Sequence, residues 1–282
     1  MLGSRFSTAA GGKGANQAVA ASRLGAQVTM VGCVGNDPYG EILLQGLNTD
    51  GVETRFVRKA AGSHTGVALI TVAEGGENSI IVISGANWQL TTDDVARAVA
   101  EIAAADLLVL QLETPLEVVD YAVRVALDQH VPVVLNPAPA RPLPSDLLAS
   151  VDYLVLNESE ASLLSGGTVN DLASAEKAAE HIRQQGVGVV ILTRGSRGAF
   201  VSAKTGSFTV PAFPVTPVDT TAAGDAFVGG LAYGLALKKP LPEAARFAAA
   251  AGGLATTKVG AQPSLPGVDE VERLLLAHPE RR

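Results

Sequence analysis

Short, continuously apolar runs alternate with amphipathic segments from about residue 88 onward. The segments at 91–105, 115–130 and 173–186 place apolar residues at helical spacing, and the first begins with Thr and Asp, which favour helix starts. The runs between them are apolar throughout, as in parallel strands that are covered on both faces. They are DLLVLQLE, VPVVLNP, VDYLVLN and VGVVILTRG. The alternation predicts an α/β fold in which helices cover both faces of a mostly parallel central sheet.

The first part of the chain has a different pattern. Residues 65–85, TGVALITVAEGGENSIIVISG, predict two strands joined by a Gly-rich turn, with no helix between them. A hairpin of this kind in an α/β protein indicates a small β-rich appendage. It could be a lid over the sheet edge or a contact between subunits.

Composition and charge exclude several functions. The 282 residues carry a net charge of -7, which argues against nucleic-acid binding, because that needs clustered Lys and Arg. The single cysteine, Cys33, lies in the apolar run VTMVGCVG, where we expect a buried strand residue rather than a reactive thiol. We find no signal peptide and no run long enough to span a bilayer, so we expect a cytoplasmic protein with no membrane partner.

Polar residues lie at the carboxyl ends of the predicted strands, where open parallel sheets bind ligands. They are Glu113, Asn136, Asn157, Glu160, Thr193 and Arg194. We expect these side chains to converge on one crevice.

The stretch PVDTTAAGDAFVGG, residues 217–230, places Asp219 and Asp225 among small and apolar residues. A helix N-terminus offers unpaired N–H groups and partial positive charge, so the amides of Ala222, Ala223 and Gly224 are predicted to bind phosphate. Asp225, ionised beside them, could accept a proton from a substrate hydroxyl, as a general base does in phosphoryl transfer. The alternative is a first-turn acid that only suits the helix dipole. We favour the base because of the apolar setting and the small residues before it.

Three further motifs are ambiguous when each is taken alone. In AAGGKGANQAVAASRLG, residues 9–25, Lys13 and Asn16 face the entry of a helix that is expected to begin near Ala15. They suit a sugar, or Lys13 is simply solvated. In NESE, residues 157–160, the ends of the motif could organise a hydrated Mg²⁺ or form a capping box, and local evidence favours the box. TRGSRG, residues 193–198, suits a nucleotide or an ordinary tight turn.

Together these motifs resemble, in order and spacing, the ribokinase family of carbohydrate kinases, the PfkB group. GGKGANQA is similar to the N-terminal signature of the family, and DTTAAGDAFVGG to its C-terminal one. LNPAPAR, NESEA, TRGSRG and KVGAQPS are closer to its ribokinase members than to fructokinases or adenosine kinases. The resemblance covers essentially the whole chain. It implies one ribokinase-like domain over 1–282, a three-layer α/β/α sandwich with a small β lid at 1–10 and 64–86.

The resemblance implies transfer of the γ-phosphoryl group of ATP to O5 of D-ribose. Asp225 would be the base, and the amides of Ala222, Ala223 and Gly224 would form the anion hole. The residues implied to contact the sugar are Gly12, Lys13, Gly14, Ala15, Asn16, Glu113 and Asp225. Asn157 and Glu160 would position Mg²⁺ through water. The residues implied to contact ATP are Asn157, Glu160, Thr193, Arg194, Gly195, Ser196, Arg197, Gly198, Gly224 and Ala249.

The resemblance also implies an activating K⁺ and a homodimer formed through the lid. Asp219 would be the side-chain ligand of the K⁺. The other implied ligands are Thr221, Ala255, Lys258, Gly260 and Ser264.

The chain departs from the family pattern at its start, where members have a strand that ends in an N-x-D element gripping the sugar. About 30 residues are expected there, the size of a strand and a lid segment. Either the start of the sequence lies too far downstream or the chain is truly short. We favour the first explanation and expect residues 1–282 alone to bind ribose weakly or to be inactive.

Two alternatives to a ribose kinase stay open. One is a kinase for another sugar or a nucleoside, such as 2-deoxyribose, fructose or an adenosine-like substrate. The other is a catalytically impaired relative that binds a sugar or nucleotide, against which the intact Gly224–Asp225 pair argues.

Overall fold

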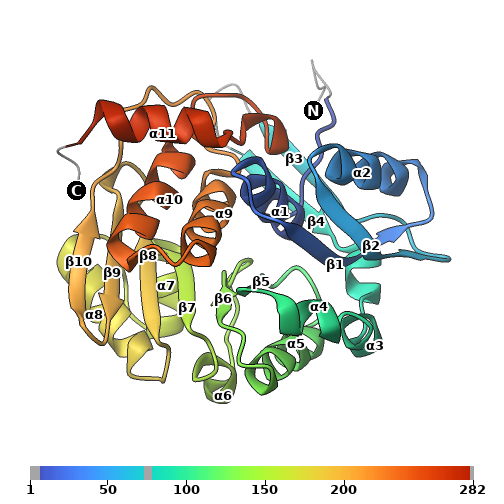
Figure 1. Ribbon diagram of the computed structural model, residues 1–282, viewed down its shortest axis with the longest axis horizontal. Helices are drawn as coiled ribbons and strands as arrows, with labels where there is room; N and C mark the ends of the chain where they lie inside the picture. Colours follow the sequence, from blue (N-terminus) through green and yellow to red (C-terminus); the bar gives the residue numbers. More distant parts are fainter. Residues whose placement is uncertain (1–6, 73–77, 280–282) are drawn as a thin grey trace.

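The computed structural model describes residues 7–72 and 78–279 (Figure 1). Its main sheet has the order β10-β9-β8-β7-β6-β5. The strands β5 to β8 pair in parallel, whereas β9 and β10 are antiparallel. Their bounds are β5 Leu108–Leu110, β6 Val133–Leu135, β7 Tyr153–Asn157, β8 Val189–Thr193, β9 Ala199–Ala203 and β10 Gly206–Val210. The predicted mostly parallel α/β sheet is confirmed.

Alternate residues of these strands pack into separate cores, because successive side chains of a strand point to opposite faces. Leu154 and Leu156 face one core, together with α5 (Leu116–Asp128), α7 (Glu158–Ser165) and α8 (Leu172–Arg183). Val155 faces the other core, which is closed by α9 (Ala223–Ala236) and α10 (Leu241–Ala255). Continuous apolar strands therefore correspond to burial on both faces, as the sequence predicted.

A second, parallel pair of strands lies beside this sheet. β1 (Val28–Gly35) pairs with β2 (Val52–Ala60), and no described strand joins either of them to β5. The helices α1 (Lys13–Arg23) and α2 (Pro38–Thr49) precede these two strands. Cys33 is buried within β1, as expected for a structural residue.

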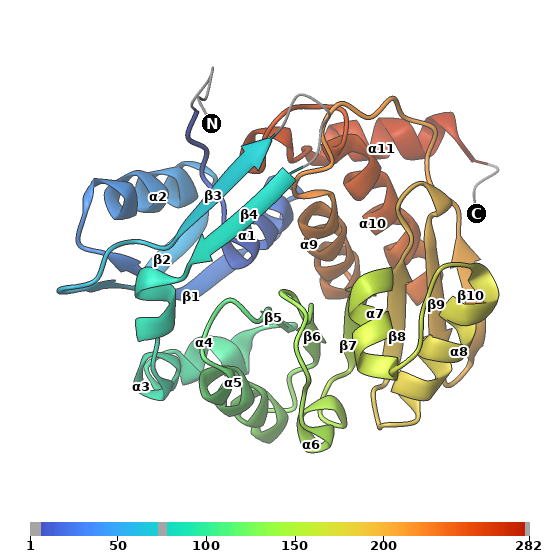
Figure 2. The same ribbon diagram turned by 180° about the vertical axis from the view of Figure 1, so that it is seen from behind.

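The predicted hairpin forms an antiparallel pair, β3 (Val67–Val72) with β4 (Asn78–Ile83). Figure 2 shows that it lies apart from the six-stranded sheet. Its turn lies outside the described residues, and so do residues 1–6 of the expected lid. Residues 7–10 form neither helix nor strand.

Three helix predictions differ from the structure. The segment 91–105 forms two short helices, α3 (Thr92–Ala96) and α4 (Val99–Ala104), with a break at Arg97 and Ala98. The predicted segment 115–130 is helical only over Leu116–Asp128, with Pro115 as the N-cap of α5. The helix α1 begins at Lys13, not near Ala15, because Gly12 already serves as its N-cap.

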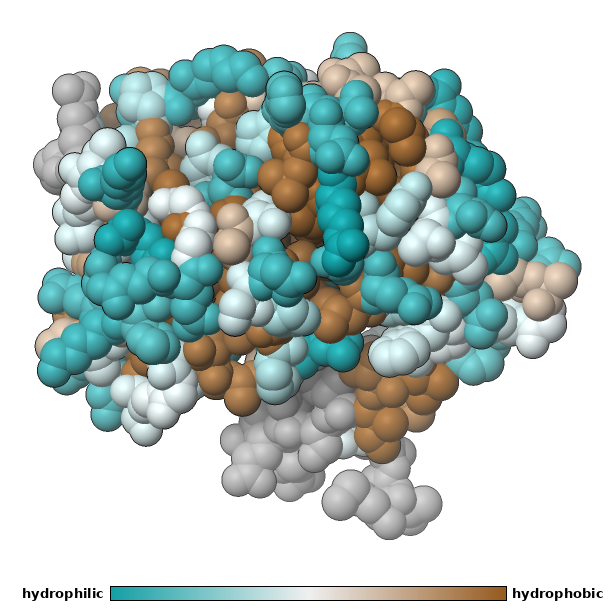
Figure 3. All heavy atoms as spheres, turned by 90° about the horizontal axis from the view of Figure 1, so that it is seen from below, coloured by the Kyte–Doolittle hydropathy of each residue, from teal (hydrophilic) through white to brown (hydrophobic). Residues whose placement is uncertain are grey.

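The remaining described elements connect these layers. They are α6 (Ser145–Leu148), α11 (Val268–Ala277) and the 3-10 turns η1 (Gly85–Gln89), η2 (Gly195–Arg197) and η3 (Gln262–Ser264). On the face drawn in Figure 3, hydrophobic side chains reach the surface at several places among hydrophilic ones.

Candidate active site

The site is built around Asp225, the third residue of α9. Its carboxylate is buried, with 7% of the residue exposed, yet it has partners. Asn16 Nδ2 donates to Oδ2 over 2.8 Å, and Gln17 Nε2 donates to Oδ1 over 3.0 Å. Both donors come from α1, more than 200 residues earlier in the chain. Hydrogen bonds to the charged form offset the cost of burying a carboxylate.

The backbone is strained where α9 begins. Its N-cap, Ala222, has a φ of 60°, in the left-handed region that a residue with a Cβ occupies at a cost. The N–H of Ala223 donates to the carbonyl of Thr220 over 3.2 Å, so this predicted anion-hole amide is directed into its own loop. A Cβ built on Gly224 would meet nothing within 4 Å, which leaves that backbone open to approach.

Close packing of two helices brings the amide donors to Asp225. A Cβ at Gly229 of α9 would lie 2.5 Å from the Cβ of Ala20 and 3.0 Å from the carbonyl oxygen of Gln17. Only a residue without a side chain fits there. The absence of a side chain at this position lets α1 approach α9 closely enough for Asn16 and Gln17 to reach Asp225.

Glu113 follows β5 and closes the start of α1. Its Oε2 accepts a 2.8 Å hydrogen bond from the backbone N–H of Lys13. Burial raises the pKa of Glu113, while that hydrogen bond and the charge of Lys13 oppose the rise. Gly12, the N-cap, has a φ of 93°, which suits glycine at this close approach.

Asn157 and Glu160 form the capping box at the start of α7. The Glu160 N–H donates to Asn157 Oδ1 over 2.9 Å, and the Asn157 N–H donates to Glu160 Oε2 over 2.8 Å. Asn157 Nδ2 also donates to Glu160 Oε1. The structure therefore shows the capping box that the local sequence favoured. Burial raises the pKa of the Glu160 carboxyl, against the lowering effect of the Asn157 N–H and the Lys13 charge.

Charged groups from four segments of the chain influence one another. The charge of Lys13 lowers the pKa of both Glu113 and Glu160, and the charge of Asp225 raises the pKa of both. The charges of Lys13 and Asp225, in the first turns of α1 and α9, therefore act on Glu113 and Glu160, which follow strands β5 and β7. An ammonium group among carboxylates suits a polyhydroxylated, phosphate-accepting substrate.

The TRGSRG turn has partners within the protein. Arg197 donates to both carboxylate oxygens of Glu158 over 2.7 Å, and Arg194 Nε lies 3.6 Å from Glu158 Oε1. Thr193 Oγ1 donates to the carbonyl of Leu156. The two arginines therefore tie the turn η2, which includes Gly195 and Ser196, to the start of α7. The Gly198 carbonyl accepts from the Arg194 N–H over 2.7 Å and closes the turn.

The Asp219 loop is joined to the segment after α10. Asp219 accepts hydrogen bonds from the N–H and hydroxyl of Thr221 and from the N–H of Gly260. Burial acts against ionisation, but these hydrogen bonds together hold the pKa of Asp219 below its usual value. Nearby, the buried Ser264 donates to the carbonyl of Ala261, and Lys258 pairs with Glu270. Asp219, Thr221 and Gly260 are thus in direct contact, whereas the Lys258 side chain points to another partner.

The remaining predicted residues pack against other parts of the protein. Ala15 packs in the small core between α1 and α9, and Ala249 is half-buried on α10. A Cβ at Gly14 would lie 2.9 Å from Gln111 Oε1. The last residue in α10, Ala255, is fully buried.

Sequence reasoning missed the roles of Gln17 and Gln111. Gln17 Nε2 donates to Asn136 Oδ1 as well as to Asp225, and Gln111 Nε2 donates to Gln17 Oε1 over 2.5 Å. Asn136 was expected at the site because it follows a strand. The only signal for Gln17 was a polar residue beside Asn16, directly before the small and apolar run Ala18–Ala21.

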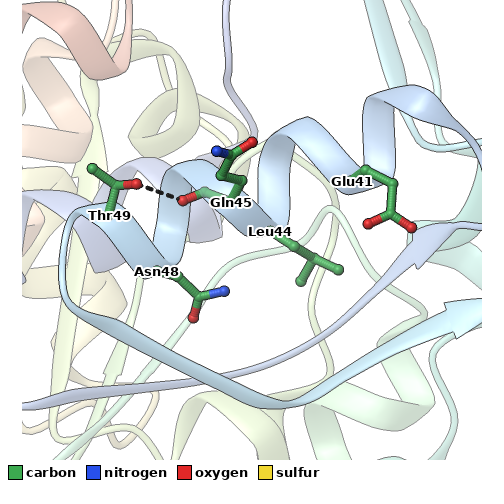
Figure 4. A pocket seen from close by; sticks show the side chains of 5 residues that line it. All are labelled: Glu41, Leu44, Gln45, Asn48 and Thr49. Atoms are coloured by element: carbon green, nitrogen blue, oxygen red, sulfur yellow. Dashed lines mark hydrogen bonds between the residues drawn. The ribbon is translucent and has the colours of Figure 1, made fainter.

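A hollow of about 610 Å³ lies elsewhere, along one face of α2 (Figure 4). All of its lining residues belong to that helix: Glu41, Leu44, Gln45, Asn48 and Thr49. Thr54 and Lys59 of β2 bond to two of these lining residues, Asn48 and Glu41, at exposed positions, whereas buried amides bond to Asp225. We therefore place the functional site at α9.

Among the described residues, no group of at least three His, Cys, Asp or Glu side chains could hold a metal ion. Within the same residues, no helix is long and apolar enough to cross a membrane.

Comparison with known proteins fits this arrangement. The model of the pfkB family of carbohydrate kinases matches residues 1–267. The chain belongs to this family. As a pfkB carbohydrate kinase it is 43% identical to a ribokinase of Haemophilus influenzae, over 98% of this chain and 90% of that protein.

Solved structures of pfkB-type kinases share its fold. The ribokinase of Arabidopsis thaliana, complexed with ribose and ATP, superposes with a TM-score of 0.88 and 32% identity, over 94% of this chain and 87% of that one. The ribokinase of Thermotoga maritima gives a TM-score of 0.86 and 35% identity, with the same coverage of both chains. The expected ribokinase-like fold is confirmed.

Proposed function

We propose that this pfkB kinase phosphorylates D-ribose with ATP and releases D-ribose 5-phosphate and ADP. The observation that carries the proposal is the buried carboxylate of Asp225, held by Asn16 and Gln17 in the first turn of α9. The similarity to the Haemophilus ribokinase and to the Arabidopsis ribokinase with ribose and ATP supports ribose and ATP as the substrates.

In the proposed reaction the 5-hydroxyl oxygen attacks the γ-phosphorus, the bond to the β-phosphate oxygen breaks, and ADP leaves. Asp225 accepts the hydroxyl proton. The amides of Ala222, Ala223 and Gly224 at the start of α9 offset the negative charge that develops on the transferred group. For Ala223 this requires the N–H to exchange its bond to Thr220 for one to the phosphoryl group.

The sugar is held by the start of α1 and by Glu113. Asn16 Oδ1 is buried and has no hydrogen-bond partner within the described part of the chain, so it is an acceptor ready for a sugar hydroxyl. Glu113, Lys13 and the backbone from Gly12 to Ala15 form the rest of the sugar site. The ionised form of the Glu113 carboxylate can accept hydrogen bonds from two vicinal hydroxyls.

The nucleotide is proposed to lie along Thr193–Gly198 and near Ala249. Asn157 and Glu160 would hold Mg²⁺ through water, since a carboxylate beside an amide offers the oxygen groups that Mg²⁺ prefers. Bound Mg²⁺ would neutralise charge on the phosphates.

The loop that contains Asp219 would hold K⁺. The fit rests on the lowered pKa of Asp219, which keeps it anionic, and on its bond to Gly260. Thr221, Ala255, Lys258, Gly260 and Ser264 would supply oxygen atoms, mostly carbonyls. The ion would brace this loop against α9.

The β3–β4 hairpin is proposed to pair two copies of the chain. It exposes Leu69, Ile70, Ile81, Val82 and Ile83, an unusual concentration of apolar side chains on a small element. A second copy could cover them in a symmetric contact.

A kinase that uses ATP as donor is expected in the cytoplasm.

A substrate panel tests the proposal. ADP release is measured with ribose, 2-deoxyribose, fructose and adenosine, and the product is identified by ³¹P NMR. We expect the highest kcat/KM with ribose and a phosphate at O5. A higher value with another acceptor would replace ribose as the substrate, and no turnover with any of them would reject the kinase assignment of this chain.

A further inference from the structure

Gln17 is a buried amide in the wall of the site, outside the reach of solvent. Only 3% of the residue is exposed. It lies next to Asn16 on α1, and the two side chains take different oxygens of the same carboxylate. Gln17 Nε2 is 3.0 Å from Asp225 Oδ1, and Asn16 Nδ2 is 2.8 Å from Oδ2.

The orientation of the Gln17 amide is determined by its neighbours. Asn136 Nδ2 donates to the backbone carbonyl of Val155 in β7, so Asn136 Oδ1 is an acceptor. Gln17 Nε2 donates to this oxygen over 3.1 Å, and Gln17 Oε1 accepts from Gln111 Nε2. An inverted amide would place an oxygen against both Asn136 Oδ1 and the carboxylate, which is unfavourable.

A chain of hydrogen bonds thus runs from the backbone of β7 through Asn136 and Gln17 to Asp225. It fixes one oxygen of the carboxylate against the rigid sheet. The other oxygen is bonded by Asn16, whose own Oδ1 has no partner among the described groups and faces the proposed sugar site. The carboxylate can rotate only if it breaks the bond to Gln17.

We propose that Gln17 is a positioning residue for the reaction: it sets the plane of the Asp225 carboxylate so that Oδ2 is directed at the substrate hydroxyl. This inference rests on the proposed function. Gln17 does not touch the sugar, because its two polar atoms are already bonded to Asp225, Asn136 and Gln111.

The test is Gln17→Met, which keeps the approximate length and volume but removes the amide. Because small misplacements of reacting groups cost about 100-fold in rate, we expect kcat to fall by that order. KM for ribose and for ATP should change by less than about three-fold, since the ligand contacts remain. A kcat within about three-fold of the wild type, or a rise in KM with kcat unchanged, would overturn the inference.

A double-mutant cycle separates positioning from a general structural role. In an Asp225→Asn background, Gln17→Met should lower the residual kcat by less than about two-fold, because there is no longer a base to position. An equal fall in both backgrounds would contradict the proposal.

If Gln17→Met does not fold, Gln111→Met serves instead. It frees Gln17 Oε1 and is expected to lower kcat by about five-fold, again only when Asp225 is present, and an unchanged kcat would reject positioning. Absence of ribose turnover in the wild type would instead reject the proposed function, so the two failures are distinguishable.

Discussion

Asp219 and Asp225 are six positions apart in one loop-to-helix segment, but their hydrogen-bond partners differ. Asp219 is bonded by its own loop and by Gly260, which makes it a brace between two segments. The Asp225 carboxylate accepts hydrogen bonds from two side-chain amides of α1, those of Asn16 and Gln17. At the residue scale, these partners assign the acids to separate roles.

Asp219→Asn should destabilise the protein in a pH-dependent way. The folded-state pKa of Asp219 is lowered, so its ionised form contributes stability above the unfolded pKa of about 3.8, and this contribution is lost as the pH falls through the folded pKa. We expect a lower Tm than wild type at pH 7 and a difference that shrinks toward pH 3. Thermal melts across this range measure it. Asp106→Asn, which removes an exposed ion pair with Lys238, is the control and should change Tm little. A difference that is constant with pH would contradict this account of Asp219.

At the scale of elements, the contact between α1 and α9 sets the site. Glycines and alanines line the faces where α9 meets α1 and α10. This close approach joins the start of α1, the proposed sugar-binding end, to Asp225, the proposed base. In the proposed mechanism, the packing of the two helices is therefore part of the catalytic geometry.

Gly229→Ala should damage both stability and activity. The added Cβ would be 2.5 Å from Ala20 Cβ, so α1 must move away. Overpacking of this kind costs about 1–3 kcal/mol, and the same shift lengthens the bonds from Asn16 and Gln17 to Asp225. Chemical denaturation and kcat measure the two effects.

Gly46→Ala on α2 is the matched control. A Cβ there meets nothing within 4 Å, and alanine is favoured over glycine within a helix by about 0.5–1 kcal/mol. We expect this variant to be as active as the wild type and slightly more stable. An unaffected kcat in Gly229→Ala would show that the helix contact does not set the site.

The sequence predicted the elements better than their contacts. Local patterns are sufficient for the buried strands, the hairpin and the capping box of Asn157 and Glu160, because each depends on residues close together in the chain. The bonds of Gln17 to Asn136 and Asp225 join residues 119 and 208 positions apart, which no local pattern encodes. Local patterns also do not encode the bond between Arg197 and Glu158, which are 39 positions apart. Arg197 was predicted to contact the nucleotide, and in the structure it bonds to Glu158.

The sequence analysis also overestimated the length of a short strand. The apolar run at 106–113 contains only three strand residues, Leu108–Leu110, since only these pair with β6. Beyond them the chain turns to bring Gln111 and Glu113 into the site. Hydrophobicity indicates burial, but pairing with a neighbouring strand decides where a strand ends.

At the scale of the whole molecule, the proposed dimer depends on the hairpin. Residues that face each other in an antiparallel pair share one face, so Leu69 and Ile81 lie on one side and Ala68 and Val82 on the other. Both Ile81 and Val82 are more than half exposed. In the proposed assembly, one face of the hairpin would pair with a second copy and the other would lie toward the sugar site.

Ile81→Lys and Val82→Lys should therefore have different effects. We expect light scattering to show that the wild type is a dimer. Ile81 and Val82 lie on opposite faces, so only the substitution on the face that pairs with the second copy should give a monomer, with an unchanged Tm. The other variant should remain a dimer and bind ribose more weakly. A monomeric wild type, or two variants that both remain dimers with unaltered ribose binding, would contradict pairing through the hairpin.

The central claim is that Asp225 removes the proton from the sugar hydroxyl during phosphoryl transfer. The most direct measurement is kcat for ribose-dependent ADP release by Asp225→Asn, compared with wild type at saturating ATP and ribose. Asparagine keeps the shape of the side chain but cannot act as a base, so we predict a loss of about 100- to 10,000-fold. Turnover by Asp225→Asn within a few-fold of the wild type would contradict the claim.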